Sequence, residues 1–432
     1  MQCSPWQHGF SAELLLQAED LVSSADQPRP GDEQRIDLCG QHCFSIDDED
    51  TLDIDDALAI EELGDGERAI WVHIADPGRL VPEGSPLDLE ARRRGSSLYL
   101  AQGALPMFPP GLAHGPFSLR MGQRCAAWSL RLLLDEEGGL KDCQVQRSWI
   151  RPSYRLSYGD ADELIDLAPP EEPAPALLHG LLERRRRWRE RRGALFLEQP
   201  EGRIRCRGER AELQVVEPSA ARALVAEAMI LSGAAIAELG CRHHLPLPYR
   251  SQLPAALPSA SELAALDPGP VRHAAIKRCL SRGHVGVTAA AHFSLGLAAY
   301  VQATSPIRRY GDLVVQRQLA AHLEGGTALG APALAALLEA IENPVREGIR
   351  LSREDQRHWQ QVWFEQNPRP SWAARFLRWL RPQDQLGLVT LEELCIDVPA
   401  HCPGGSEPGL ALRLKVLEVD SLRDILRLQA GA

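Results

Sequence analysis

The stretch FSIDDEDTLDIDDA, residues 44–57, is the most informative part of this chain. It carries seven acidic residues within ten positions, and apolar runs flank it at 43–46 and 57–60. Crowding so many carboxylates costs Coulomb energy unless a cation offsets it. A merely solvated acidic loop would not need apolar anchors on both sides. The pattern therefore favours a metal site, and a surface acidic loop remains the alternative.

The residue types in this stretch suit a hard divalent cation. Mg²⁺ binds a few carboxylates together with water and substrate phosphate. A calcium-binding EF-hand needs Gly at the sixth position of its loop. Counted from Asp47 or from Asp53, that position holds Leu52 or Leu58. The sequence thus argues for magnesium and against calcium storage.

A second motif, TSPIRRY at residues 304–310, combines helix-start residues with two arginines. Ser305 is a good N-cap and Pro306 suits a first turn, so we expect a helix over 306–324. Arg308 and Arg309 would oppose the helix dipole in that turn. This cost suggests that they are present to bind an anion.

The remaining chain alternates short apolar strands with longer helical patterns. Buried strands are predicted at 69–75 and 126–134, and helices at 11–24, 85–94, 218–240 and 332–361. We expect a leader over 1–32 with one helix, an α+β domain over 33–365, and a small OB-like β-barrel over 366–432. The arginine run 184–187 lies on a helix and faces either water or phosphate.

The start of the predicted barrel mixes basic and aromatic side chains, a combination typical of proteins that bind single strands. A β-domain without a ligand remains the alternative. The residues concerned are Arg375, Arg378, Arg381, Trp372, Phe376 and Trp379.

Composition limits the partners and the compartment. The chain has 432 residues, 44% apolar and 25% charged, which is ordinary for a globular protein. Its net charge of −12 would repel nucleic acid, so any such ligand needs a local basic groove. No apolar run approaches the ~20 residues that span a bilayer, and the start lacks signal-peptide features. We expect a cytoplasmic monomer without a membrane partner and with reduced cysteines.

Together, the two motifs resemble the exoribonuclease II family (RNase II and RNase R), whose catalytic domain is called RNB. Further similar stretches follow in the family's order: HIADP at 73–77, LDLEA at 87–91 running to GSSLYL at 95–100, and HFSLGL at 292–297. The resemblance covers roughly residues 33–365. The terminal barrel looks like a short version of the family's RNA-binding OB domain.

The resemblance implies an RNB-type, Mg²⁺-dependent enzyme that hydrolyses single-stranded RNA from the 3′ end and releases nucleoside 5′-monophosphates. One or two Mg²⁺ ions would be held by Asp47, Asp53, Asp55 and Asp56. Asp55 and Arg308 would be catalytic, with Arg308 at the scissile or neighbouring phosphate. Substrate contacts would come from Tyr99, Tyr158, Phe196, Glu227 and Glu354. Of these, Tyr99 and Phe196 would stack on bases.

Two alternatives and two departures accompany this interpretation, one of the departures being the short C-terminal barrel. The chain could be a catalytically weak RNA-binding protein of the same family, or a deoxyribonuclease with the same two-metal chemistry. Retention of the four aspartates and Arg308 favours the ribonuclease. The larger bacterial members carry two cold-shock-type domains before the catalytic domain, whereas about 32 residues precede it here. We therefore expect weaker affinity for long RNA.

Overall fold

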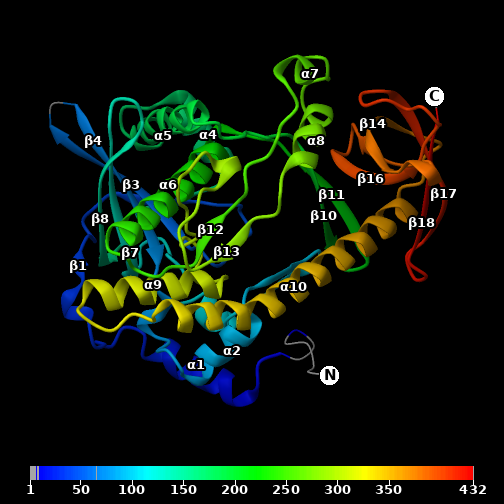
Figure 1. The fold of residues 1–432 in the computed structure, drawn as a ribbon. Coiled ribbons are helices and arrows are strands. Elements are labelled where there is room, and N and C mark those ends of the chain that lie inside the picture. The colour runs from blue at the N-terminus through cyan, green and yellow to red at the C-terminus, as the bar shows by residue number, and fades with distance from the viewer. Residues whose placement is uncertain (1–5, 7–8, 65, 432) are drawn as a thin grey trace.

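The computed structural model describes residues 6, 9–64 and 66–431, and a mixed seven-stranded sheet lies at its centre (Figure 1). The strand order is β1-β8-β7-β4-β3-β2-β9. Neighbours are antiparallel except at β1–β8 and β2–β9, which are parallel. In the order of the sheet, the strands are Ile36–Asp37, Leu140–Ile150, Cys125–Leu134, Glu67–Ala75, Asp56–Gly64, Cys43–Ile46 and Tyr154–Leu156.

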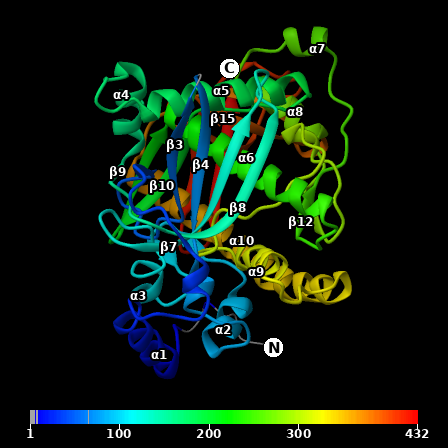
Figure 2. The ribbon, with the colours of Figure 1, turned by 90° about the vertical axis from the view of Figure 1, so that its left-hand side faces the viewer.

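Both faces of the sheet are buried, as the period of two along β4 shows. Ile70, Val72 and Ile74 point into one hydrophobic core, whereas Trp71 and Ala75 point into the other. Helices α4 (Tyr158–Leu167), α5 (Ala174–Arg191) and α6 (Ala220–Arg242) cover the first face. Figure 2 shows β3, β4 and β8 in front of α6. The predicted strands β4 and β7 are confirmed.

The second face is covered by α2 (Pro86–Arg94), α3 (Pro110–Ala113), α9 (Tyr310–Leu323) and the first part of α10 (Ala331–Gln366). The leader helix α1 (Ala12–Ser23) packs beside α2 and α3. Its N-cap is Ser11, whose hydroxyl accepts the Leu14 amide at 3.3 Å. Helices α7 (Ala260–Ala264) and α8 (Pro270–Cys279) complete the set.

The C-terminal domain is a closed five-stranded barrel, ordered β14-β15-β16-β18-β17, and it is OB-like as expected. Its strands are Trp372–Arg381, Leu386–Leu391, Ile396–His401, Ala411–Asp420 and Ile425–Gly431. Helix α10 runs from the body built on the seven-stranded sheet to this barrel (Figure 1). Trp359, Trp363 and Phe364 in its last turns belong to the barrel's core. The long helix and the barrel are therefore packed as one unit.

Three two-stranded sheets lie outside the main one: β5–β6 (Leu98–Leu100, Gly103–Leu105), β10–β11 (Glu201–Arg207, Arg210–Val216) and β12–β13 (Tyr249–Ser251, His284–Gly286). Strand β10 docks against the barrel where Gly202 donates its amide to Cys395 at 2.8 Å. A Cβ at Gly202 would lie 2.1 Å from the Leu394 carbonyl oxygen. Only glycine fits this approach, which fixes the hairpin against the barrel.

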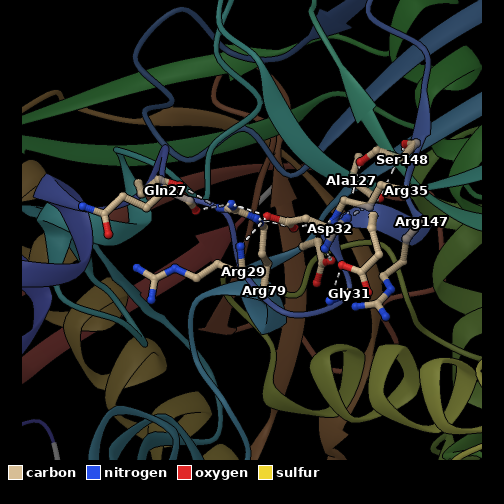
Figure 3. Close-up of polar contacts among 12 residues, drawn as sticks. Gln27, Arg29, Gly31, Asp32, Arg35, Arg79, Ala127, Arg147 and Ser148 are labelled. Atoms are coloured by element: carbon tan, nitrogen blue, oxygen red, sulfur yellow. Dashed lines mark hydrogen bonds and ion pairs between the residues drawn. The ribbon is translucent and has the colours of Figure 1, made fainter.

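The leader is attached through Asp32, as Figure 3 shows. Its carboxylate accepts Nε and Nη2 of Arg79, both at 2.8 Å, and Nε of Arg35 at 3.2 Å. Burial raises the pKa of Asp32, but the hydrogen bonds from Arg79 and from the Arg29 amide, with both arginine charges, lower it to about 2. Arg79 also donates to the backbone oxygens of Ala25 and Gln27. The linker is thus held to the sheet.

Two sequence-based expectations are wrong at the level of local structure. The helix expected over 306–324 begins at Tyr310, and residues 306–308 form a turn. The amides there have other acceptors: Ile307 donates to Asp55 and Ser305 to Asp312. Helix α6 is also long and apolar enough to span a bilayer, although no such stretch was expected. Most of that stretch is buried inside this protein.

The aromatic residues at the start of the barrel do not form a stacking surface. Trp372 and Phe376 are fully buried in the barrel's core. Trp379 is half-buried and packs edge-on against Phe376. Trp372 and Phe376 lie at alternating positions of β14 and therefore face the barrel interior, where hydrophobic packing explains their presence. The predicted base-binding role is wrong for Trp372 and Phe376.

Candidate active site

The acidic loop 47–55 connects β2 to β3 at one end of the sheet. Asp47 follows β2, and its amide donates to the Leu156 carbonyl of β9 at 3.1 Å. The loop returns through Ile54, whose amide donates to the Ser118 hydroxyl at 2.9 Å. Asp56 is the first residue of β3 and is paired with Ile74 of β4. The sheet therefore holds both ends of the loop in place.

Asp55 is the buried centre of this site. Its Oδ1 accepts the Ile307 amide at 3.0 Å, and its Oδ2 accepts Nε of Arg308 at 3.0 Å. The side chain of Asp55 is 3% exposed and that of Arg308 is 44% exposed. The aspartate thus fixes the backbone of the turn and also leaves part of the guanidinium open to a ligand.

The carboxylates of the site resist ionisation. Burial raises the pKa of Asp55 to about 7, against the opposing charge of Arg308 and the amide of Ile307. Burial and the charges of Asp55 and Asp47 raise the pKa of Asp56 to about 8. Burial also raises the pKa of Asp47, although the Asp48 amide and the Thr51 hydroxyl donate to it. The negative charges are therefore close enough to repel one another.

The carboxylate oxygens of the four predicted ligands suit a hard cation, although in this structure they do not converge on one point. Within the described ranges, no group of three or more His, Cys, Asp or Glu side chains lies close enough to hold an ion as arranged. Asp55 is engaged by Arg308 instead. Mutually repelling oxygen donors are what a divalent cation would stabilise. Asp53 is half-buried and offers the same kind of oxygen donor, and its negative charge raises the pKa of Asp55.

Tyr99 and Tyr158 both lie close enough to the aspartates to feel their charge. Tyr99, on β5, is 46% exposed. Burial of its hydroxyl raises its pKa to about 12, against the nearby charge of Arg308. Tyr158 begins α4, and burial together with the charges of Asp47 and Asp56 raises its pKa. Two predicted substrate residues are thus brought to the aspartates.

Glu227 and Phe196 form a separate cluster around an arginine. Nε of Arg189 lies 2.8 Å from Oε1 of Glu227, and Nη2 contacts Oε2. The two side chains are 4% and 3% exposed. The Arg189 and Arg186 guanidinium carbons lie 5.1 and 4.3 Å from the Phe196 ring centroid. Glu227 is therefore an ion-pair partner inside the protein.

Glu354 lies apart from both clusters. It is on α10, exposed, and paired with Arg350 at 2.8 Å along the helix. Its neighbours on the same helix are nearer to the site: Ser352 donates to the Tyr99 carbonyl at 2.9 Å, and Asp355 accepts the Ala101 amide at 2.7 Å. The segment around Glu354 therefore supports the strand that carries Tyr99.

Comparison with known proteins identifies the family of the main domain. The family model of the RNB domain matches the sequence of residues 35–325, which is more than half of the chain. This chain belongs to the RNB family. The match includes the acidic loop, Tyr99, Glu227 and Arg308, and it ends before α10 and the barrel.

Relatives extend the similarity over nearly the whole chain. An uncharacterized ribonuclease of Synechocystis sp. is 42% identical over 93% of this chain and 60% of its own length. The chloroplastic/mitochondrial Ribonuclease II of Arabidopsis thaliana is 34% identical over 96% of this chain and 52% of its own length. The chain thus spans a little over half the length of these two relatives.

Two solved structures share the fold at low sequence identity. RNase R of Mycoplasma genitalium in complex with ribose-methylated single-stranded RNA has a TM-score of 0.84 at 19% identity, covering 98% of this chain and 75% of that one. Yeast Ssd1, described as a pseudonuclease, has a TM-score of 0.67 at 18% identity over 91% of this chain and 53% of that one. These likenesses establish the fold alone.

The RNB domain also contains site residues that the sequence did not reveal. Arg222 of α6 pairs with Asp48 at 2.8 Å, and its guanidinium lies 3.9 Å from the Tyr158 ring centroid. On β10, Arg203 lies 3.6 Å from Asp48, and Arg205 pairs with Asp50. The alternating arginines of β10 were the available signal. Asp48 and Asp50 pair with these arginines, which distinguishes them from the four aspartates predicted to bind metal.

Proposed function

We propose that this RNB protein is a Mg²⁺-dependent exoribonuclease that degrades single-stranded RNA from the 3′ end to nucleoside 5′-monophosphates, as a cytoplasmic monomer. The observation that carries the proposal is the Asp55–Arg308 pair at 3.0 Å beside Asp47, Asp53 and Asp56. It joins an anion-binding cation to a set of oxygen donors within one family domain. Nucleases of this family are generally dependent on divalent metal ions.

The chemistry of phosphodiester hydrolysis matches these residues. Bound Mg²⁺ would activate water and offset charge on the leaving oxygen, with Asp47, Asp53, Asp55 and Asp56 as its ligands. Arg308 supplies a fixed positive charge where negative charge spreads over the phosphate in the transition state. Asp55 orients that guanidinium before the substrate arrives, which lowers the reorganisation needed for reaction.

Positions for bases lie at Tyr99 and Phe196. Tyr99 presents a partly exposed aromatic ring beside Arg308. Aromatic rings stack on any base, so the strand can be held without sequence preference. We propose that Tyr99 stacks near the 3′ end, that Tyr158 contacts the strand across the carboxylates, and that Phe196 stacks a further base. Glu227 and Glu354 remain proposed contacts to the RNA.

The second candidate is a catalytically weak RNA-binding protein of the same family. Two observations favour it: the described carboxylates do not converge as they stand, and the fold is shared with a protein described as a pseudonuclease. Under this alternative, Arg308 and the aromatic side chains would bind RNA, and the aspartates would only hold the turn that precedes α9.

Incubation of the pure protein with 5′-labelled single-stranded RNA and Mg²⁺ tests both candidates. A ladder that shortens from the 3′ end, and that disappears with EDTA, supports the exoribonuclease. Intact RNA that nevertheless shifts on a native gel supports the binding protein. Asp55→Asn is expected to abolish the ladder. Asp50→Asn is the matched control, because Asp50 is an exposed acid of the same loop outside the predicted ligand set. A labelled DNA strand of the same sequence tests the sugar preference.

A further inference from the structure

A cavity of about 140 Å³ lies where the barrel meets α8 of the RNB domain. Figure 1 shows α8 beside β14 and β16. Val271 and Ala274 of α8 pack on Leu377 of β14, which joins the two domains next to the cavity. Its lining includes Gln199, Lys277, Arg278, Arg378, Leu388 and Asp397.

Among the described residues, the three cations of this cavity lack an acidic partner at ion-pair distance. Some arginines of the same barrel are paired: Arg375 lies 2.9 Å from Asp267, and Arg381 lies 3.2 Å from Asp384. By contrast, over residues 9–64 and 66–431 no carboxylate lies within 4.0 Å of the charged nitrogens of Lys277, Arg278 or Arg378. Arg413 is likewise unpaired over these residues, so the distinguishing feature of the three is that they line one cavity together.

One carboxylate contributes to the cavity, and it does not balance the cations. Burial raises the pKa of Asp397, and the Thr390 hydrogen bond and the charges of Lys277 and Arg378 lower it only in part. Lys277 and Arg378 therefore both act on the carboxylate of Asp397. Even with Asp397 ionised, two positive charges stay uncompensated in a cavity between two domains. That arrangement attracts an anion.

We propose that this cavity binds a backbone phosphate of the RNA strand on its way to the active site. Arg378 offers a planar fork that suits a phosphate, and Lys277 a mobile point charge. The cavity also lies close to a predicted base position. Gln199 is three residues after Phe196, so their Cα atoms are at most about 11 Å apart. A strand that stacks on Phe196 passes near the cavity.

This inference rests on the proposed function, and RNA binding measured without hydrolysis separates the two. Affinity is measured by fluorescence anisotropy in EDTA, with single-stranded RNA of about 16 and about four nucleotides. The double variant Lys277→Gln/Arg378→Gln is compared with wild type across a salt series. We expect about tenfold weaker binding of the long strand and a salt slope smaller by about 0.7, the value for one lost phosphate contact. The short strand should bind as tightly as before.

Arg413→Gln/Lys415→Gln is the matched control, since it also removes two positive charges, from exposed side chains of β17 in the same barrel that do not line the cavity. An equal loss in this control would reduce the effect to net charge and overturn the proposal. Equal loss for both strand lengths would place the defect in the active site and also overturn it.

Calorimetry with inorganic phosphate gives a further test. If the double variant loses phosphate binding but keeps its RNA affinity, the cavity binds a free anion and not the RNA strand. Wild-type protein that binds RNA but never shortens it would contradict the proposed function and leave the cavity's role intact.

Discussion

Nε of Arg308 lies 3.0 Å from Oδ2 of Asp55, although the two residues are 253 positions apart in the chain. The other carboxylate oxygen accepts the Ile307 amide, so one aspartate holds both the side chain and the backbone of the turn before α9. This contact delays the start of the helix to Tyr310. The same aspartate would serve as a metal ligand, so binding of an ion would compete with Arg308 for it.

We expect Asp55→Asn to raise the melting temperature of the metal-free protein while abolishing hydrolysis. The pKa of Asp55 is raised to about 7 by burial, so its contribution to stability is fully present below its unfolded pKa and is lost as the pH rises through 7. At about pH 8 the ionised carboxylate is therefore unfavourable, and a neutral amide relieves that cost. Each 1 kcal/mol gained corresponds to about 2–4 °C.

The measurement is a pair of melting curves in EDTA, at about pH 8 and about pH 4, beside a product ladder in Mg²⁺. The difference between the variants should vanish at the lower pH, where Asp55 is protonated. Turnover should fall by several powers of ten, at one per 1.4 kcal/mol of barrier. A variant that melts below wild type at pH 8 would contradict the burial argument. Unchanged turnover would contradict the metal assignment.

Tyr99→Ala should weaken binding of the RNA 3′ end by about 1–3 kcal/mol, the usual loss of one stacked base. Stability should change little, because the side chain is 46% exposed. Tyr99→Phe is the control, since it keeps the ring and removes only the hydroxyl. Anisotropy with short RNA gives the affinity, and the ladder gives the size of the final product. A large drop in melting temperature with normal activity per folded molecule would make Tyr99 a packing residue instead.

The sequence predicted the elements with a clear period and the residues with a clear spacing. Strands β4 and β7 have continuous apolar runs because both faces of the sheet are buried. The spaced aspartates predicted a candidate metal site because carboxylates are rarely crowded without a reason, and that assignment stays a prediction. The same logic failed for Trp372 and Phe376, because a barrel interior needs aromatic residues as much as a binding face does.

What could not be predicted are pairings set by the tertiary fold. Nothing local indicates that Arg189 reaches Glu227 across 38 positions, or that Arg222 reaches Asp48 across 174. The arginine run on α5 left two possibilities open. In the structure, Arg185 and Arg189 are buried, whereas Arg187 pairs with Glu183. Such contacts depend on how the helices cross, which a period of 3.6 residues does not encode.

Arg189→Met should destabilise the fold by about 3–5 kcal/mol, because it leaves the Glu227 carboxylate buried without its partner. The double variant Arg189→Met/Glu227→Gln removes both charges and should recover most of that loss. Urea unfolding measures the effect. If the double variant folds well but binds the RNA 3′ end more weakly, Glu227 contacts the strand. If it regains wild-type affinity and turnover, the pair is only structural, and the predicted contact is wrong.

The last prediction concerns His73 on β4, which is fully buried and whose Nδ1 lies 2.7 Å from the Ser129 hydroxyl. Burial lowers its pKa to about 3. The unfolded chain takes up this proton near pH 6.5, whereas the folded chain does not until about pH 3. Unfolding therefore binds a proton in that window, and His73 alone lowers stability by about 1.4 kcal/mol per pH unit as the pH drops, whereas Asp55 and Asp56 act in the opposite direction there. Asp32, with a pKa of about 2, changes the pH dependence of stability only below about pH 3.8.

The side chain of His73→Gln cannot titrate. The amount by which this variant is less stable than wild type at about pH 7 should therefore shrink towards about pH 5. Urea unfolding across that range tests this, with the exposed His401→Gln as control. Parallel curves for wild type and His73→Gln would show that His73 is not the titrating group.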